Sequence, residues 1–419
     1  MSESSIKTYD LKRFAQINKR FIGWNEKAMS ELFKPGTIWS MSLKNRVIRS
    51  ATEEMHASSD GRITDDYVRL YAQLAKGGVG LIITGNYGIN VLGRASPRTV
   101  LVDDDETIGN LEELVNTVHD NGTKIVAQLN HVGRQRYTAM EDDYTPVAPS
   151  PVKVKYTGVK PRPMTEEEIE DTIEAFGRAA RRVKEAGFDG MQIHGAHGYL
   201  INQFLSGHTN RRNDKWGGSA ENRRRFLIEV YKSIRNAVGN DYPVLIKINA
   251  RDPVPRGVTL DETVETCKIL DTLKIDAIEV SDGIDELIKG GIPTDIIMRG
   301  RNIFQRIMVR FLIETMVKKH ARLVEGYHLS DAATVRKNVK VPVIAVGALR
   351  RREMMEYAIS SGQADYVALS RPFIRQPNLV NLMEKDNGDP IQCISCNRCA
   401  LEMIVHLKPL RCYQKKEKD

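Results

Sequence analysis

The stretch GFDGMQIHGAHGYLINQF, residues 187–204, contains a short apolar run bounded by glycines, a pattern of the kind that recurs along the chain. It also contains the densest group of reactive side chains in the sequence. The short apolar run 189–195 is bounded by glycines, which predicts a buried β-strand. The glycines that follow it predict a turn, and this turn carries His197 and Tyr199 close to His194 at the strand end. Catalytic groups of α/β barrels gather at the carboxyl ends of strands, so we expect an active site here.

Two other interpretations of these three rings remain open. Buried imidazoles and a phenol can simply satisfy their own hydrogen bonds, and an H-x-x-H pair can also ligate zinc. The zinc interpretation is weaker because no third ligand lies within reach along the sequence. Three polar rings at one strand end favour a catalytic role over both alternatives.

Outward from this stretch, short β-branched runs alternate with polar segments of helical period. We expect strands over 46–51, 79–85, 124–130, 189–195, 243–249, 276–281, 341–346 and 365–370. We expect helices over 64–76, 106–121, 166–186, 220–238, 261–273, 330–338 and 350–361. Eight such strands alternating with helices predict an α/β fold of the (β/α)8 TIM-barrel type. A doubly wound sheet shows the same alternation, but no G-x-G-x-x-G follows any of these strands.

The chain divides into three expected parts. Residues 1–31 form an N-terminal extension, 32–386 the barrel, and 387–419 a cysteine-rich, cluster-binding segment. Two long connections, 131–164 and 282–329, follow strands and are candidate lids over the active face. The second of these connections also predicts an added helix near 302–320.

Composition excludes several classes of function. Apolar residues make up 41% of the chain and charged residues 28%, yet no run reaches the roughly 20 apolar residues of a membrane helix. The N-terminus shows no secretory signal, so we expect a cytoplasmic protein. The net charge of +8 is spread along the chain and mixed with acidic residues, and no DNA-reading motif is present. We therefore expect neither a nucleic-acid partner nor a membrane.

The segment IHGAHGYLINQFLSGHTNRRNDKWGGSAENRRRF (193–226) resembles the signature of the old yellow enzyme family, the FMN-dependent barrel ene-reductases. That signature runs H-x-A-[HN]-G-Y-L, then F-L-S-x-x-x-N-x-R-x-D, an aromatic residue, and G-G-S-x-E-N-R. Further resemblance covers 43–51, 126–134, 243–252, 342–350 and 365–374. It spans roughly residues 32–385 and implies a barrel that holds FMN at the carboxyl ends of its strands.

The resemblance implies a role for each matching residue. His194 and His197 would hold the carbonyl oxygen of an unsaturated substrate as negative charge develops on it. Tyr199 would protonate the α-carbon after a hydride from reduced FMN reaches the β-carbon. The residues implied to contact the flavin and its phosphate are Ser50, Ala51, Thr52, Gly85, Gln128, Lys247, Gly347, Ala348, Ser370 and Arg371.

Two positions depart from the commonest family pattern. Lys247 stands where many relatives carry Arg, so it keeps the positive charge beside the flavin pyrimidine but loses the planar fork. Glu53 occupies the position of a Thr or Cys that bonds flavin O4 in many relatives. A carboxylate there would raise the cost of flavin reduction unless it were protonated or turned away.

The segment CISCNRCALEMIVHLKPLRC (393–412) contains four of the five cysteines, at the spacing C-x2-C-x2-C-x12-C. Zinc ribbons pair two C-x-x-C knuckles, whereas three close cysteines and one distant resemble ferredoxin-type loops. The spacing resembles that of the iron–sulfur branch of the same family, which includes 2,4-dienoyl-CoA reductase and trimethylamine dehydrogenase. We therefore expect a [4Fe–4S] cluster, with zinc or a decayed site as alternatives. The expected ligands are Cys393, Cys396, Cys399 and Cys412.

Larger members of that branch continue into FAD- and NAD-binding domains, but only seven residues follow Cys412. We therefore expect electrons to come from NAD(P)H directly or from a separate reduced carrier, a ferredoxin or a flavoprotein. The first hypothesis for function is reduction of the C=C bond of an α,β-unsaturated carbonyl compound. Alternatives are an oxidative amine dehydrogenase or demethylase, and an electron-relay subunit. We also expect a homo-oligomer.

Overall fold

Eight parallel strands close into a barrel in this computed structural model, which describes residues 30–136, 144–154, 158–283, 324–385 and 391–414. The strands follow one another around the barrel in chain order, and this confirms the (β/α)8 architecture. They are β3 (Val47–Arg49), β4 (Leu81–Gly88), β5 (Lys124–Asn130), β8 (Gly190–Gly195), β9 (Val244–Asn249), β10 (Ala277–Ser281), β11 (Val343–Val346) and β12 (Tyr366–Leu369). All eight coincide with the runs expected from the sequence.

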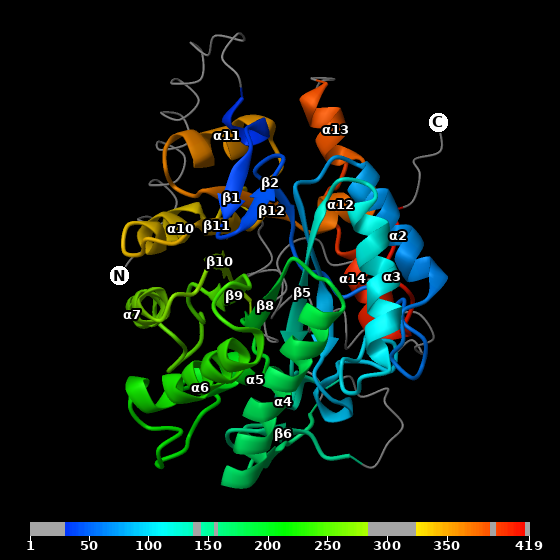
Figure 1. The fold of residues 1–419 in the computed structure, drawn as a ribbon. Helices are drawn as coiled ribbons and strands as arrows, with labels where there is room; N and C mark the ends of the chain where they lie inside the picture. Colours follow the sequence, from blue (N-terminus) through cyan, green and yellow to red (C-terminus); the bar gives the residue numbers. More distant parts are fainter. Residues whose placement is uncertain (1–29, 137–143, 155–157, 284–323, 386–390, 415–419) are drawn as a thin grey trace, which may run out of the picture.

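Helices surround the barrel on its outside (Figure 1). The seven expected ones are α2 (Asp65–Lys76), α3 (Thr107–His119), α4 (Glu166–Glu185), α6 (Ala220–Val238), α7 (Leu260–Thr272), α10 (Leu329–Arg336) and α11 (Arg352–Ser360). Capping boxes fix the first turns of α4 and α7, where Thr165 pairs with Glu168 and Thr259 with Glu262. The described ranges also contain four short α-helices that were not expected: α5 (Leu200–Leu205), α12 (Arg371–Arg375), α13 (Leu379–Glu384) and α14 (Arg398–His406).

The core has two layers. A large cluster lies between the strands and the outer helices, and a smaller one fills the barrel interior. An antiparallel hairpin, β1 (Gly36–Ile38) and β2 (Met41–Leu43), adds buried side chains to the inner cluster beside Ile48 of β3 and Leu81 of β4. Leu81 is the first residue of β4, and Ile48 pairs with it in register, so the hairpin closes the amino-terminal end of the barrel and leaves the carboxyl end for chemistry.

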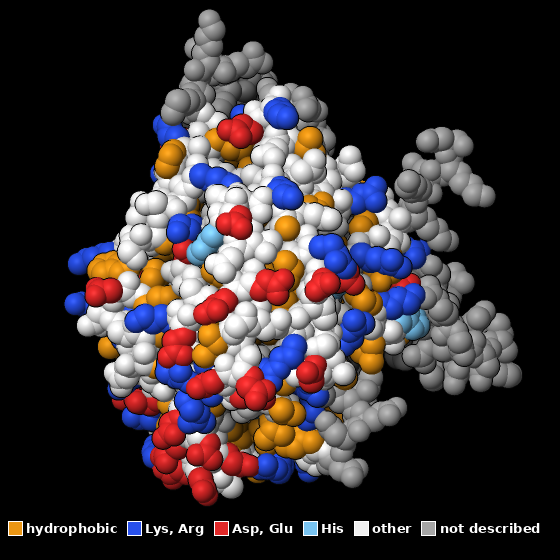
Figure 2. Space-filling model, turned by 45° about the vertical axis from the view of Figure 1, so that its right-hand side comes forward, with side chains coloured by type: hydrophobic (Ala, Val, Ile, Leu, Met, Phe, Trp, Pro, Cys, Tyr) orange, Lys and Arg blue, Asp and Glu red, His pale blue; other side chains and the backbone are white. Residues whose placement is uncertain are grey.

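The connections that were expected to form lids are only partly described. In the first, 131–164, the short parallel strands β6 (Val147–Ala148) and β7 (Arg162–Pro163) pair with each other. The helix expected near 302–320 lies outside the described residues, as does almost all of the N-terminal extension. Within the described ranges, we find no helix with the length and apolar character needed to cross a bilayer. Figure 2 shows basic and acidic side chains interspersed over one face of the molecule.

Candidate active site at the barrel mouth

Strand β8 delivers the three predicted rings to one place. The imidazole of His194 lies edge-on to both neighbours, with ring centroids 5.1 Å from His197 and 4.9 Å from Tyr199. The backbone N–H of Ala196 donates to Nδ1 of His194 at 3.4 Å. Because Nδ1 accepts this bond, the proton of a neutral His194 lies on Nε2, which is then a donor.

The position of His197 is held from neighbouring strands. Its backbone adopts a left-handed conformation with φ of 62°, and its N–H donates to Oδ1 of Asn249 at 3.1 Å. The side-chain amide of Asn249 in turn donates to Asp252 at 2.9 Å. Nε2 of His197 lies 2.8 Å from the hydroxyl of Ser281, so a substrate oxygen would compete with that hydroxyl. This left-handed residue therefore sits on a support built from β9 and β10.

Both imidazoles are neutral at physiological pH. Burial, assisted by the neighbouring His197 and by the positive charge of Lys247, holds the pKa of His194 well below its usual value. Burial and Lys247 likewise lower the pKa of His197 to about 3. The pair therefore offers neutral hydrogen-bond donors to a developing oxyanion rather than two positive charges.

A buried polar network crosses the barrel beside these rings, since Lys247 is the register partner of His194 on the neighbouring strand. Lys247 donates to the hydroxyl of Ser50 at 2.8 Å and lies 3.3 Å from a carboxylate oxygen of Glu279. The Ser50 hydroxyl donates to Glu279 at 2.6 Å. On its other side, Glu279 accepts from Gln192 at 2.8 Å, and Gln192 accepts from Gln128 at 2.7 Å. Both members of the ion pair are fully buried, so this network fixes the cation at the barrel mouth.

A cavity of about 180 Å³ opens above this network. Eight of the predicted site residues line it: Ser50, Ala51, His197, Lys247, Gly347, Ala348, Ser370 and Arg371. Gly347 has φ of 142° and Ala348 has φ of 51°, so the backbone after β11 is bent into conformations that turn its amides away from the strand ladder. Such amides beside Arg371 are suited to a phosphate.

The remaining predicted residues lie around this cavity rather than in its lining. Gln128 is tied to Gln192, and the hydroxyl of Thr52 donates to the carbonyl of Ser50 at 3.0 Å. At Gly85, an added Cβ would lie 2.0 Å from Oε2 of Glu54 and 2.5 Å from the carbonyl of Thr52. The loop after β3 therefore requires glycine at this position, whatever contact a flavin also makes.

Unsatisfied buried polar atoms at the mouth fit a bound polar ring. Asn130 ends β5 on the same face as Gln128 and is 1% exposed, yet neither its amide oxygen nor its nitrogen has a hydrogen-bond partner among the described residues. Oε2 of Glu53 is also buried and unpartnered in that part of the chain. Burial and the charge of Glu54 raise the pKa of Glu53 to about 8. The carboxyl of Glu53 is therefore mostly protonated at neutral pH and can donate a hydrogen bond.

The cysteine segment packs against the phosphate side of the cavity. All four of its thiols line one hollow together with Arg371 and Arg375. Ser395, which lies between the first two cysteines, lines the cavity as well, and Arg371 donates to the side chain of Asn397 at 2.5 Å. Burial, mainly, raises the pKa of Cys399 to about 11. The donors share one hollow, although no three His, Cys, Asp or Glu side chains of the described ranges are arranged to hold a metal ion.

Sequence reasoning missed several residues of this site. Glu279 and Ser281 are polar positions inside an apolar strand, a signal that could have singled them out. Tyr327 lines the cavity and its ring lies 4.1 Å, centroid to centroid, from that of His328. Tyr327 follows a long connection with no recognisable pattern, so no sequence signal pointed to it.

Comparison with known proteins places this site in a family. The sequence profile of the NADH:flavin oxidoreductase / NADH oxidase family, a group of FMN oxidoreductases, matches residues 31–289 and 303–389. The chain belongs to this family, that of old yellow enzyme. It is 37% identical over 91% of its length to an NADH oxidase of Thermoanaerobacter brockii, of which it covers 55%. It is 35% identical over 86% of its length to an NADPH dehydrogenase of a Geobacillus strain, of which it covers 95%.

Solved structures agree with this assignment of the family. A 2-naphthoyl-CoA reductase in complex with 2-naphthoyl-CoA superimposes with a TM-score of 0.80 at 27% identity, covering 91% of this chain and 56% of that one. The chain thus spans little more than half the length of this reductase and of the NADH oxidase.

Proposed function

We propose that this family member reduces the C=C bond of an α,β-unsaturated carbonyl compound, with FMN as its cofactor. The observation that carries the proposal is the cluster of His194, His197 and Tyr199 at the end of β8, beside the fully buried cation of Lys247. FMN, when bound, supplies a hydride to the β-carbon of the substrate. The cavity above Lys247 and the amide of Asn130, which has no partner in the described ranges, support a polar, planar cofactor at this place.

The residues of the chain would bind the substrate carbonyl, supply the proton and hold the cofactor. Nε2–H of the neutral His194 donates to the substrate carbonyl, and His197 joins it once the substrate oxygen replaces the Ser281 hydroxyl. These bonds strengthen as negative charge moves onto the carbonyl oxygen, which lowers the barrier to hydride addition. Tyr199 then gives its phenolic proton to the α-carbon. Lys247 and the Gly347–Ala348 turn would hold the pyrimidine edge and the phosphate of the cofactor.

We further propose that Cys393, Cys396, Cys399 and Cys412 hold a [4Fe–4S] cluster that exchanges electrons with the flavin. The hollow that the four thiols share, and the presence of Ser395 in the lining of the main cavity, support this assignment. Thiolates are the usual ligands of such clusters. Reduced carriers such as ferredoxin, or NAD(P)H acting directly at the barrel mouth, remain the proposed electron donors. The 387–419 segment would then act as the cluster-binding unit beside the 32–386 barrel.

The direct test is Tyr199→Phe in FMN-loaded protein. We expect reduction of the flavin by NADPH to be unchanged and reoxidation by an enone to slow by at least about 100-fold, the range of a lost proton donor. His328→Gln is a useful control, because it alters another polar ring near the cavity without touching the proton donor. Unchanged enone turnover in Tyr199→Phe would rule out the assigned role. Flavin reduction by a secondary amine, without enone turnover, would instead favour the oxidative alternative.

A further inference from the structure

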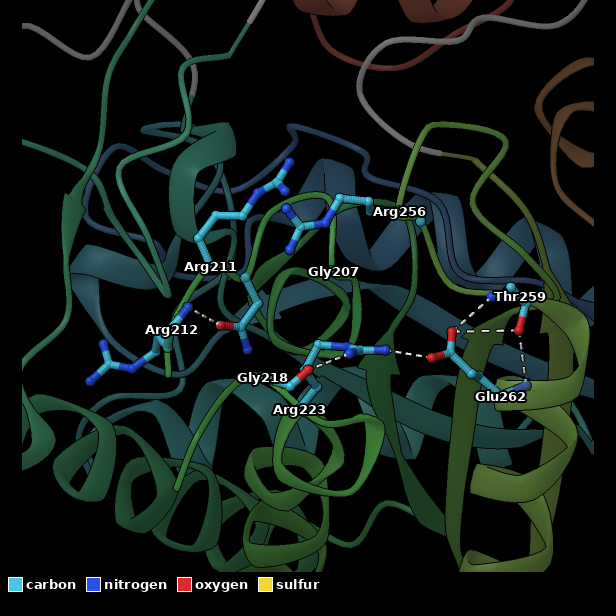
Figure 3. Close-up of a pocket in the computed structure, with 10 residues that line it drawn as sticks. Gly207, Arg211, Arg212, Gly218, Arg223, Arg256, Thr259 and Glu262 are labelled. Carbon is cyan, nitrogen blue, oxygen red and sulfur yellow. Dashed lines mark hydrogen bonds and ion pairs between the residues drawn. The ribbon is translucent and has the colours of Figure 1, made fainter. Parts of the chain in front are cut away.

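A second pocket lies at the rim of the barrel mouth, between the loops that follow α5 and β9. Its volume is about 240 Å³, far above the roughly 10–15 Å³ that one water requires. Figure 3 shows four arginines and one carboxylate around it. These are Arg211, Arg212, Arg223, Arg256 and Glu262. We call it the rim pocket.

Two of the four arginines are already neutralised. Arg212 forms an ion pair with Asp214 at 2.6 Å. Arg223 is paired with Glu262 and also donates to the carbonyls of Leu205 and Gly218, at 2.9 and 2.8 Å. These two side chains form a fixed wall of the rim pocket.

The positive charges of the other two arginines are not neutralised within the described parts of the chain. The guanidinium ends of Arg211 and Arg256 face each other in Figure 3, and neither has a carboxylate partner in the described parts of the chain. Arg211 donates only to the carbonyl of His208 at 3.1 Å through its side chain. Burial and the like charge of Arg256 lower the pKa of Arg211, as expected for two cations held close together. Facing guanidiniums repel each other unless an anion lies between them.

The backbone holds this arrangement in place. Arg256 has φ of 62°, a left-handed conformation, and a Cβ added to Gly207 would lie 2.9 Å from its carbonyl oxygen. Glycine at 207 therefore lets the two loops approach each other. Gly218, next to the N-cap of α6, and Thr259, the N-cap of α7, both line the rim pocket, so the positive ends of these two long helices add to its field.

We propose that the rim pocket binds a phosphate group of one of the reactants, clamped between Arg211 and Arg256. Two N–H groups of one guanidinium can donate to two oxygens of a phosphate. The charge of one phosphate also balances two guanidiniums, whereas that of a single carboxylate does not. The loop after β9 also supports one catalytic ring: Asp252, four residues before Arg256, accepts a hydrogen bond from the Asn249 that holds His197. The inference of a reactant as ligand rests on the proposed function. Two sources share this chemistry, the carrier of an acyl-CoA substrate and a nicotinamide dinucleotide.

Direct binding tests the proposal without turnover. Inorganic pyrophosphate and adenosine 3′,5′-bisphosphate are titrated calorimetrically into the FMN-loaded protein, with Arg211→Gln, Arg256→Gln and Arg178→Gln compared. Arg178 is an exposed residue of α4 paired with Glu174, so its variant is the matched control. We expect each pocket variant to weaken binding by about 10-fold or more, and the control to bind as the wild type does. Absence of binding by the wild type, unchanged binding in both pocket variants, or equally tight binding of acetate would overturn the proposal.

Kinetics identify the source of the phosphate. We compare crotonyl-CoA with its N-acetylcysteamine thioester, which lacks phosphates, and vary NADPH separately. A raised KM for crotonyl-CoA in Arg256→Gln, with an unchanged KM for the truncated thioester, identifies the substrate carrier. A raised KM for NADPH identifies the electron donor. If binding is lost but neither KM changes, the assignment to a reactant is wrong. Failure of enone turnover altogether would sink the proposed function while leaving the calorimetric result to stand by itself.

Discussion

The buried pair of Lys247 and Glu279 allows a prediction about stability that can be worked out from the structure. Their charged atoms lie 3.3 Å apart, and their side chains are 2% and 0% exposed. At an effective dielectric constant of about 20, the attraction between unit charges at that distance is about 5 kcal/mol. Removing one member of a buried pair leaves the other uncompensated, which typically costs about 3–5 kcal/mol.

Glu279→Gln should therefore lower the free energy of unfolding by about 3–5 kcal/mol. In the wild type the two carboxylate oxygens of Glu279 accept hydrogen bonds from Ser50 and Gln192. The variant replaces one of these oxygens by an NH2 group, which is a donor, so one of the two bonds is also lost. Lys247→Met should cost a similar amount, and the double variant should cost about 3 kcal/mol less than the sum, because it leaves no unpaired charge. Glu174→Gln, which breaks an exposed pair on α4, should cost less than about 1 kcal/mol.

Urea denaturation of the FMN-loaded protein, followed by circular dichroism, measures these changes. The slope with denaturant should be equal in all variants, so that the midpoints report stability alone. A cost below about 1 kcal/mol for Glu279→Gln, or strictly additive costs in the double variant, would refute the ion-pair interpretation of this network.

Three further predictions concern Glu53, the turn after β11 and the cysteines. The pKa of Glu53 is raised to about 8, so the native state binds the proton of this carboxyl more tightly than the unfolded chain does. Glu53 therefore makes the wild type lose stability as pH rises from about 4.5 to 8. Relative to the wild type, Glu53→Gln should gain stability between pH 5 and 8 in urea melts, and a pH-independent difference would contradict this. Gly347→Ala should cost about 1–3 kcal/mol and weaken FMN retention, because alanine is strained at φ of 142° and its Cβ would lie 2.9 Å from His328; full FMN content and an unchanged melting temperature would contradict the assigned turn. Protein purified anaerobically should contain about four iron atoms per chain. The iron should be lost in Cys393→Ser and Cys412→Ser but kept in the control Cys267→Ser, whose thiol lies buried elsewhere. Absence of iron and acid-labile sulfide from the wild type would overturn the cluster assignment.

The sequence predicted the barrel well because hydrophobic period and turn residues are local signals. All eight strands and seven helices lie where these signals placed them, and the only sizeable error at a strand end is β4, which continues past Gly85 to Gly88 through an irregularity between Ile83 and Asn86. Helix α14 lacks a local start signal, because its N-cap residue Asn397 makes no side-chain capping hydrogen bond, and the sequence therefore did not predict it.

The sequence predicted the three rings of the site but not the residues that hold the site together. His194, His197 and Tyr199 share one strand end, so their proximity follows from the chain itself. The contacts of Glu279 with Ser50 and Gln192 join residues 229 and 87 positions apart, and no local pattern reports such pairs. The facing guanidiniums of the rim pocket come from two separate loops and are equally invisible in the sequence.

The central claim is that the rings at the end of β8 direct hydride and proton to opposite carbons of an activated double bond. The most direct measurement follows the isotope content of the product. FMN-loaded protein turns over cyclohexenone or crotonyl-CoA in ordinary water with NADPH deuterated at the transferred position, donor and acceptor being present together so that the hydride passes on before it exchanges with solvent. The experiment is repeated with unlabelled NADPH in deuterium oxide. We expect deuterium at the β-carbon in the first case and at the α-carbon in the second, with the α-labelled product greatly diminished in Tyr199→Phe. A reduced flavin that neither substrate reoxidises, or a product formed at the same rate by Tyr199→Phe, would contradict the claim.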